Sequence, residues 1–384
     1  MVLYEDNKAK YDAVSKDLFR LVQRDEKIHD VEFKTKPIGF FMDVWLRFVK
    51  NKASVIAAVI ILIISFFAVF GPGMNEYTYD EQHTELTNMP PKVPFIAKMN
   101  LGFFDGGYTM ENRKYDNLND PEKYPEGCIL EVINPRLVNG ERIVDVVVDY
   151  YKYKGLSDEQ CFWFGSDYLG RDIWTRMWRG ARVSLIIAVV SVCCNVFIGV
   201  VYGSISGYYG GKVDMVMMRI TEIINAFPRI VVVTLFIMVF GTGMFSIIMS
   251  LVIKDWVSTA RMVRSQFYRF KGREYVLAAR TLGVRDMALI FRHILPNSIG
   301  PIITRAMIAI PGAIFTESFL AYIGLGIRAP ESSIGVLLSQ GQKVMQQYPN
   351  QVFFPAVVIS LLMIAFNMLS NGLRDAFDPT QRGA

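Results

Sequence analysis

Long apolar runs constrain the fold of this 384-residue sequence more than any other feature. Residues 53–70 contain no charged side chain, and comparable runs follow at 183–206, 227–245, 244–259, 302–324 and 351–369. A helix needs about 20 apolar residues to cross the hydrocarbon core of a bilayer, which is roughly 30 Å thick. The recurrence of such runs argues against a soluble protein with buried helices. It predicts an all-α polytopic membrane protein with six transmembrane helices.

The distribution of charge, more than the net charge of +5, predicts how these helices are oriented. Segment 261–292 contains eight Lys and Arg residues and only two acidic residues, whereas the link 241–243 contains no charge. Cytoplasmic loops are enriched in Lys and Arg, so we expect segment 261–292 to face the cytoplasm. With six spans both termini are then cytoplasmic, in agreement with the basic residues that precede the first run: Lys34, Lys36, Arg47, Lys50 and Lys52.

The predicted organisation has five parts. A cytoplasmic tail with an interfacial helix occupies residues 1–52, and the first transmembrane helix occupies 53–70. An extracellular insert with a second interfacial helix follows at 71–182. A five-helix core with a cytoplasmic loop at 261–297 then occupies 183–373, and a cytoplasmic tail occupies 374–384. The first run is not a cleavable signal peptide, because about fifty residues precede it. The first interfacial helix is predicted from a shared apolar face formed by Phe41, Val44, Trp45 and Phe48. The second is predicted from the aromatic and basic residues Arg171, Trp174, Arg176, Met177, Trp178, Arg179 and Arg182.

The extracellular insert is expected to contain a small β element. Apolar and β-branched runs at 128–137 and 142–153 flank the dipeptide Asn139 and Gly140. Asn-Gly supplies the positive φ angles of a tight hairpin turn. The sequence therefore predicts a β-hairpin within a small extracellular α/β insert.

Charged residues inside the apolar runs are candidate functional residues, because each costs roughly 2.5–3.5 kcal/mol at the centre of a bilayer. Glu317 lies in the fifth run, and Lys254 and Asp255 interrupt the fourth. Two interpretations remain open. Either these side chains line a polar pathway or a partner contact in the bundle interior, or they form a structural pair or lie near a water-filled boundary.

Small residues in the second run are expected to serve packing. Gly199, Gly203 and Gly207 follow one another at four-residue spacing, which removes side-chain bulk along one stripe and predicts close helix contact. The alternative is that these glycines only soften the helix. Cys193 and Cys194 lie in the same run and are also expected to be packing residues.

No catalytic or metal-binding constellation is evident. The three histidines, His29, His83 and His293, lack the spacing of metal ligands, so we expect no metal site. Cys128 and Cys161 share the extracellular insert, where a disulfide is chemically allowed. Either a bridge or two free thiols is compatible with the sequence.

Segment 274–297, EYVLAARTLGVRDMALIFRHILPN, predicts a short helix, a glycine stop and a second helix. Gly283 suits the left-handed C-terminal cap of the first helix, and Asp286 suits the N-cap of the second. Soluble DNA-binding units share this pattern, but their second helix presents polar side chains to base edges. Here the second helix is apolar and leads into a further transmembrane run. We therefore expect a two-helix knob that docks against protein or membrane, with a membrane-anchored DNA-binding regulator as an alternative.

The same segment resembles the cytoplasmic coupling loop of permeases in binding-protein-dependent ABC importers, whose pattern is Glu-Ala-Ala, three residues, Gly, and a closing Leu-Pro. The residues that match this pattern are Ala278, Ala279, Gly283, Leu295 and Pro296, and those that match its peptide-importer version are Tyr275, Arg280, His293 and Asn297. Four further stretches resemble motifs of the C subunit of oligopeptide, dipeptide and nickel permeases: FGSDYLGRDIWTRMWRGARVSL, VDMVMMRITEIINAFP, ESFLAYIGLGIRAP and NGLRDAFDP. Together these stretches cover residues 165–379.

Some positions depart from the family pattern. Glu222 and Asn371 stand where an aspartate is usual, and Ala321 stands where a serine is usual. These changes are mild and leave the implied roles intact. The insert is longer than the resemblance leads us to expect, and the resemblance does not explain it.

The resemblance implies the six-helix permease fold of type I ABC importers, in the cell membrane of a prokaryote. The implied ATPase-coupling residues are Glu274, Tyr275, Ala278, Ala279, Arg280, Gly283, His293, Leu295 and Pro296. The chain itself would be a non-catalytic permease that forms half of the pathway and binds no cofactor, with ATP and Mg²⁺ on partner subunits. The implied partners are a homologous second permease subunit, two ABC ATPase subunits, an extracellular substrate-binding protein and the lipid bilayer, but no nucleic acid. Oligopeptides or dipeptides are the expected cargo, ahead of nickel or another small solute, and an ATP-independent secondary transporter or channel is the alternative class.

Overall fold

The computed structural model describes residues 39–97, 104–157 and 160–377. The chain divides into two units, Met1–Asp43 and Val44–Ala384, and the architecture below is that of the second unit. The predictions for Lys34 and Lys36, for the rest of the tail up to residue 38 and for residues 378–384 lie outside the described residues.

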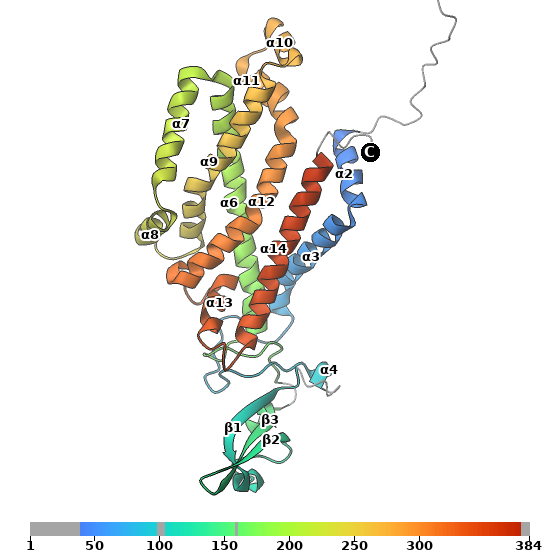
Figure 1. Ribbon diagram of the computed structural model, residues 1–384, viewed down its shortest axis with the longest axis vertical. Helices are drawn as coiled ribbons and strands as arrows, with labels where there is room; N and C mark the ends of the chain where they lie inside the picture. The colour runs from blue at the N-terminus through green and yellow to red at the C-terminus, as the bar shows by residue number, and fades with distance from the viewer. Residues whose placement is uncertain (1–38, 98–103, 158–159, 378–384) are drawn as a thin grey trace, which may run out of the picture. The chain divides into compact units, whose positions relative to one another are not determined.

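Four of the six predicted spans coincide with long apolar helices (Figure 1). Among the described residues, the segments long and apolar enough to cross a membrane by themselves are Lys52–Gly73, Ile173–Tyr209, Asp286–Leu325 and Asn350–Phe377. They contain the helices α3 (Lys52–Phe70), α6 (Ile173–Tyr209), α12 (Ile299–Leu320) and α14 (Asn350–Phe377). These correspond to the first, second, fifth and sixth predicted spans.

The third and fourth predicted spans are less regular. α7 (Gly211–Ala226) and α8 (Arg229–Phe240) are bent by 80° relative to each other, and they qualify as a span only as a pair. The bend falls at Pro228, whose ring nitrogen cannot donate a helical hydrogen bond. α8 has only 12 residues, about 18 Å of helix, so the third span is a bent pair rather than one helix at 227–245. α9 (Met244–Phe270) is long enough to cross a membrane, but its charged residues keep it out of the set of helices that are apolar enough to do so.

The predicted interfacial helix before the second span is not a separate element. α6 runs without a break for 37 residues from Ile173 to Tyr209, so the predicted boundary at residue 182 is wrong. The first turns of α6 are buried in protein: Met177 is 0% exposed and Trp178 is 8% exposed. The aromatic residues of this stretch therefore serve packing inside the bundle, and not contact with the membrane interface.

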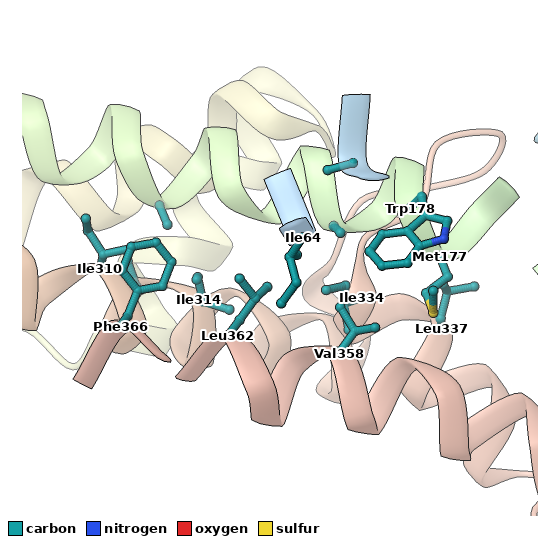
Figure 2. Packing of buried hydrophobic residues seen from close by; sticks show 14 of the residues in the cluster. Ile64, Met177, Trp178, Ile310, Ile314, Ile334, Leu337, Val358, Leu362 and Phe366 are labelled. Atoms are coloured by element: carbon teal, nitrogen blue, oxygen red, sulfur yellow. The ribbon is translucent and has the colours of Figure 1, made fainter. Parts of the chain in front are cut away.

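The main apolar core lies where α3, α6, α12, α13 (Ile334–Gln342) and α14 meet (Figure 2). Each helix contributes side chains that are almost fully buried, among them Ile64, Met177, Ile314, Leu337 and Leu362. Lipid chains are as apolar as these side chains, so the hydrophobic effect does not drive the helices together within a bilayer. Van der Waals contact between closely fitting side chains holds this part of the bundle.

The three glycines of α6 lie against α9. A Cβ atom placed on Gly203 would lie 2.3 Å from the carbonyl oxygen of Ala260, which is closer than any normal contact. Cβ atoms on Gly199 and Gly207 would lie within 3 Å of α9 as well, each 2.6 Å from a side-chain carbon. The missing side chains therefore permit the close approach of the two helices.

The segment predicted as an extracellular insert contains a three-stranded antiparallel sheet of β1 (Gly107–Lys114), β2 (Ile129–Val138) and β3 (Glu141–Asp149), in the order β1-β3-β2. Asn139 and Gly140 have φ angles of 52° and 82°, which confirms the predicted hairpin between β2 and β3. The same segment also contains short helical turns: η2 (Gly71–Gly73), α4 (Pro94–Ala97), η3 (Tyr115–Asn119) and α5 (Tyr150–Tyr153). The sequence analysis missed β1, because only Met110 of that strand is buried and its other side chains give no apolar alternation.

The structure forms no disulfide bond among the four cysteines, all of which lie in its described residues. Cys128 and Cys161 are buried and unbridged, which answers the question that the sequence left open. Cys194 is half-buried, whereas Cys193 is exposed on the surface of this chain, so the prediction that Cys193 packs inside the chain is wrong.

The predicted apolar face of α2 (Phe40–Lys50) serves partly to hold this helix on the bundle. Val44 and Phe48 are each 7% exposed and pack against Ala376 in α14. Trp45 is 60% exposed. Only part of the face is therefore free to contact a membrane.

Candidate functional site

α10 (Glu274–Thr281) is a short helix at the end of the bundle where α6 and α9 finish (Figure 1). Val276 and Ala279 anchor it, being 0% and 8% exposed in an apolar cluster with Phe267 and Ile290. Gly283 has a φ angle of 80°, so the helix ends in the left-handed conformation that the sequence predicted.

Apolar side chains are exposed on α10 and directly after it. Tyr275 is 40% exposed, Leu277 is 47% exposed, and Leu282, which directly follows the helix, is 84% exposed. The predicted coupling residues Glu274, Ala278 and Arg280 are exposed on the same helix. An anchored helix with an exposed apolar face has the character of a protein docking surface.

A shared tyrosine hydroxyl links α10 to the end of α6. Arg280 donates a hydrogen bond to the Tyr208 hydroxyl at 3.2 Å, and this hydroxyl donates to Oδ1 of Asp286 at 2.5 Å. Asp286 is the first residue of α11 (Asp286–Ala288), and Arg285 occupies the N-cap position without a side-chain cap. The prediction that Asp286 caps this helix is therefore wrong, since its carboxylate is engaged by Tyr208.

The second predicted helix of the knob is continuous with the transmembrane helix that follows it. α11 continues through η4 (Leu289–Ile294) and η5 (Leu295–Ser298) into α12 as one helical segment. Of the coupling residues predicted here, His293 and Leu295 are half-buried and Pro296 is exposed. α10 is therefore joined directly to a transmembrane helix.

A second polar network ties the same end of the bundle together, and the sequence analysis missed it. Asp214 of α7 accepts two hydrogen bonds from Arg264 at 2.5 Å each, one from Ser206 at 2.5 Å and one from Tyr268 at 2.9 Å. These partners lie on α6 and α9, so one carboxylate connects three helices. The available signal was the single acidic residue in the apolar stretch VDMVMM.

A polar cavity of about 500 Å³ lies between the α7–α8 bend, α9 and α12. Its lining is entirely polar and consists of Asn225, Arg229, Lys254, Asp255, Ser258, Arg261 and Arg305. A neighbouring cavity of about 280 Å³ shares Arg229, Asp255, Ser258 and Arg305, and is otherwise lined mostly by apolar side chains. The structure thus brings the predicted residues Lys254 and Asp255 to one polar surface. Of the other lining residues, Arg305 could have been found from the sequence, because it lies inside the fifth apolar run.

Lys254 and Asp255 have different partners. Asp255 accepts two hydrogen bonds from Arg229 at 2.6 and 3.2 Å. Lys254 donates to the backbone carbonyl of Phe227 at the bend between α7 and α8. Arg305 donates to the Ser258 hydroxyl at 2.8 Å.

Glu317 occupies a different place in the bundle interior. Its side chain is 0% exposed, and its Oε2 accepts a hydrogen bond from Ser184 of α6 at 2.8 Å. The interaction joins the C-terminal end of α12 to α6. Its assignment to a pathway stays a prediction.

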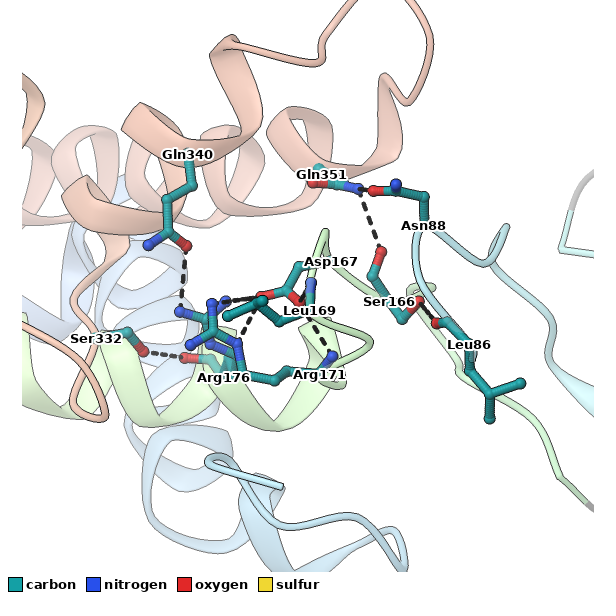
Figure 3. Close-up of polar contacts among 10 residues, drawn as sticks. All are labelled: Leu86, Asn88, Ser166, Asp167, Leu169, Arg171, Arg176, Ser332, Gln340 and Gln351. Carbon is teal, nitrogen blue, oxygen red and sulfur yellow. Dashed lines mark hydrogen bonds and ion pairs between the residues drawn. The ribbon is translucent and has the colours of Figure 1, made fainter. Parts of the chain in front are cut away.

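At the outer end of α6, a buried ion cluster holds the insert on the bundle (Figure 3). Asp167 forms ion pairs with Arg171 at 2.8 Å and with Arg176, and all three side chains are at most 5% exposed. Arg176 also donates to Gln340 of α13 at 3.2 Å. The predicted interfacial arginines 171 and 176 are therefore structural residues inside the protein.

The polypeptide around this cluster is closely packed. Ser166 donates to the carbonyl oxygen of Leu86 at 2.5 Å, and its own carbonyl oxygen accepts from Gln351 of α14 at 3.2 Å (Figure 3). Gly170 has a φ angle of 72°, and a Cβ atom there would lie 1.8 Å from the carbonyl oxygen of His83. Gly170, the second glycine in the motif FGSDYLGRD, is thus required by a close backbone contact.

Among the described residues, no group of three or more His, Cys, Asp or Glu side chains is placed to hold a metal ion. The fold and the sites instead define a multi-pass membrane protein with a short anchored helix at one end and a polar cavity between its helices.

Two family models match the chain. Residues 199–383 match the binding-protein-dependent transport system inner membrane component, and residues 39–91 match the N-terminal transmembrane domain of oligopeptide transport permease C. The chain belongs to this family and is a permease subunit of an ABC importer. This assignment excludes both alternative classes, the secondary transporter and the DNA-binding regulator.

Curated relatives match over most of their length. The oligopeptide transport system permease protein OppC of Bacillus subtilis is 34% identical over 90% of this chain and 92% of its own. The dipeptide transport system permease protein DppC of the same organism is 33% identical over 94% and 92%. The oligopeptide permease protein OppC of Escherichia coli K12 is 31% identical over 90% and 92%. Among solved structures, an inward-facing MetNI methionine ABC transporter matches with a TM-score of 0.42 and 16% identity, over 51% of this chain and 94% of that chain.

Proposed function

We propose that this chain is the C-type permease subunit of a peptide importer and that α10 couples it to ABC ATPase subunits. The proposal rests on the exposed apolar side chains of α10 and of Leu282 beside it, because Val276 and Ala279 hold this helix on the bundle. The cargo is proposed from the relatives, two of which are named as oligopeptide and dipeptide permeases.

In this proposal α10 and both termini lie in the cytoplasm, and the insert lies outside. The chain forms half of the pathway and a homologous second permease forms the other half. Two ATPase subunits bind ATP and Mg²⁺, and an extracellular binding protein delivers the peptide. This chain binds no cofactor of its own.

The structure supplies a physical route from α10 to the pathway. A rigid-body movement of α10 acts on Tyr208 and Asp286, and therefore on the last turn of α6 and the start of the α11–α12 segment. The Asp214 cluster ties the same turn of α6 to α7 and α9. α7, α9 and α12 all contribute to the polar cavity. ATP-driven movement of the ATPases would thus change the shape of that cavity.

The variant Leu282→Asp tests the docking role. Leu282 is 84% exposed, so its replacement leaves the fold of this chain intact. Loss of a leucine side chain from an interface costs about 1.5–3 kcal/mol, or roughly 10- to 100-fold in affinity. We expect ATPase co-purification and peptide uptake to fall together. Leu137→Asp is the matched control, because Leu137 is 74% exposed on β2 of the insert. Wild-type ATPase recovery with Leu282→Asp, in properly inserted protein, would refute the docking role.

A further inference from the structure

The polar cavity between the α7–α8 bend, α9 and α12 has a large excess of positive charge. Arg229, Lys254, Arg261 and Arg305 line it, and Asp255 is the acidic residue among its lining side chains. Four cations and one anion leave a net charge of +3. Charges of this kind are costly at membrane depth unless they face a polar cavity or a charged partner.

The contacts of these cations do not cancel their charge. Asp255 is occupied by both terminal nitrogens of Arg229. Lys254 donates to backbone carbonyls and Arg305 donates to the Ser258 hydroxyl, and these acceptors are neutral. Arg261 is exposed at the same surface. The cavity is therefore suited to an anion beyond Asp255, which the described residues do not supply.

The neighbouring cavity adds a second property. It begins at Arg229, Asp255, Ser258 and Arg305 and continues over apolar side chains that include Val192 and Ile308. Together the two cavities offer a cationic end and an apolar end. A peptide terminus has this combination, because a carboxylate is attached to a residue whose side chain is often apolar.

We propose that these cavities form a subsite for the carboxylate terminus of a peptide in transit, with Arg305, Lys254 and Arg261 facing the carboxylate. The inference rests on the proposed peptide cargo. Guanidinium groups bind carboxylates with paired, charge-assisted hydrogen bonds. Asp255 holds Arg229 and lowers the positive potential, so the carboxylate is bound weakly enough to leave, as conduction through a pathway requires.

A thiol reporter in the assembled importer tests this subsite without relying on selection by the binding protein. Asn225 lines the cavity and its side chain is exposed, so Asn225→Cys places a thiol there. We expect an anionic methanethiosulfonate to label this thiol faster than a cationic one of similar size. Adding Arg305→Gln removes one charge from the cavity and should lower the ratio of anionic to cationic labelling about fivefold or more. The importer without Asn225→Cys gives the background from native thiols.

Two further measurements define the ligand and the control. Excess trialanine should slow labelling of the reporter, whereas trialanine amide, which lacks the carboxylate, should not. Arg269→Gln is the control for the loss of one positive charge, because Arg269 lies on α9 outside the cavity lining and contacts Phe270. It should leave the labelling ratio unchanged.

Three results would overturn the subsite: equal protection by trialanine and its amide, a labelling ratio that does not respond to Arg305→Gln, or a reporter that neither reagent reaches. The last result would mean that another chain fills the cavity. If only the subsite hypothesis is wrong, the wild-type importer still takes up peptide and still co-purifies with its ATPase subunits. If the proposed function is wrong, the wild-type importer does not take up peptide at all.

Discussion

The contact between α6 and α9 makes a sharp prediction about Gly203. A Cβ atom at this position would lie 2.3 Å from the carbonyl oxygen of Ala260 and 2.9 Å from Cβ of Val263. The first of these atoms belongs to the backbone and cannot rotate away. The variant Gly203→Ala must therefore move the two helices apart by about 1 Å to restore normal van der Waals separation.

The cost of this movement follows from the loss of close contact along the stripe. Inserting a methyl group into a closely packed interface typically costs about 1–3 kcal/mol. Better helix propensity offsets part of this, because alanine is favoured over glycine by at most about 1 kcal/mol in a helix. We therefore expect Gly203→Ala to lower the free energy of unfolding by about 1–2 kcal/mol.

The matched control is Gly312→Ala in α12. Gly312 also lies inside a helix, but a Cβ atom there meets nothing within 4 Å. This variant should be neutral or slightly stabilised. Thermal and denaturant unfolding of the purified importer compares both variants with the wild type. If Gly203→Ala is as stable as Gly312→Ala, the close α6–α9 contact does not exist as described.

Three further predictions concern the outer side of the protein. Asp167→Asn leaves Arg171 and Arg176 buried without their carboxylate and should cost about 3–5 kcal/mol of unfolding free energy. The control Glu331→Gln breaks the more exposed ion pair with Arg179 and should cost less than about 1 kcal/mol. Equal losses for the two variants would contradict the buried cluster. Burial and its hydrogen bond with Tyr108 raise the pKa of Tyr348 from 10.0 to about 12. Because the folded-state pKa is the higher one, this contribution to stability is complete below pH 10 and is lost as the pH rises to about 12. The difference in tyrosinate absorbance between wild type and Tyr348→Phe should show the transition near pH 12, and a transition near pH 10 would refute the assignment. Removing reductant or adding it should leave the unfolding temperature unchanged, because no disulfide joins the buried residues Cys128 and Cys161, and a lower unfolding temperature in reductant would reveal a bridge.

The sequence predicted features that depend on local patterns. Apolar runs located α3, α6, α12 and α14, because a span needs only length and composition. The Asn139–Gly140 turn and the left-handed Gly283 were predicted for the same reason, since each depends on the backbone of one or two residues.

Features that depend on long-range contact were missed or misplaced. Trp178 and Arg176 have the composition of an interfacial helix, and only the folded structure shows that Asp167 and the core bury them. Asp286 fits an N-cap by its position, but the distant residue Tyr208 takes its carboxylate. Nothing in local spacing indicates which helix a side chain will meet.

The polar cavity falls between these cases. Lys254 and Asp255 were recognised because charge inside an apolar run is conspicuous. Arg229 follows the proline of the bend, and Arg261 lies in the arginine-rich segment, where positive charge was attributed to topology. Only the packing of α8, α9 and α12 brings them to one surface.

The uninterrupted course of α6 limits how this protein can move. Its 37 residues form a rod of about 55 Å, fixed near one tip by the Asp167 cluster and at the other by the Tyr208 hydroxyl. A stiff rod of this length cannot pivot at one tip while the other stays still. The two ends of the bundle are therefore mechanically linked, and a tilt of α6 displaces both of them.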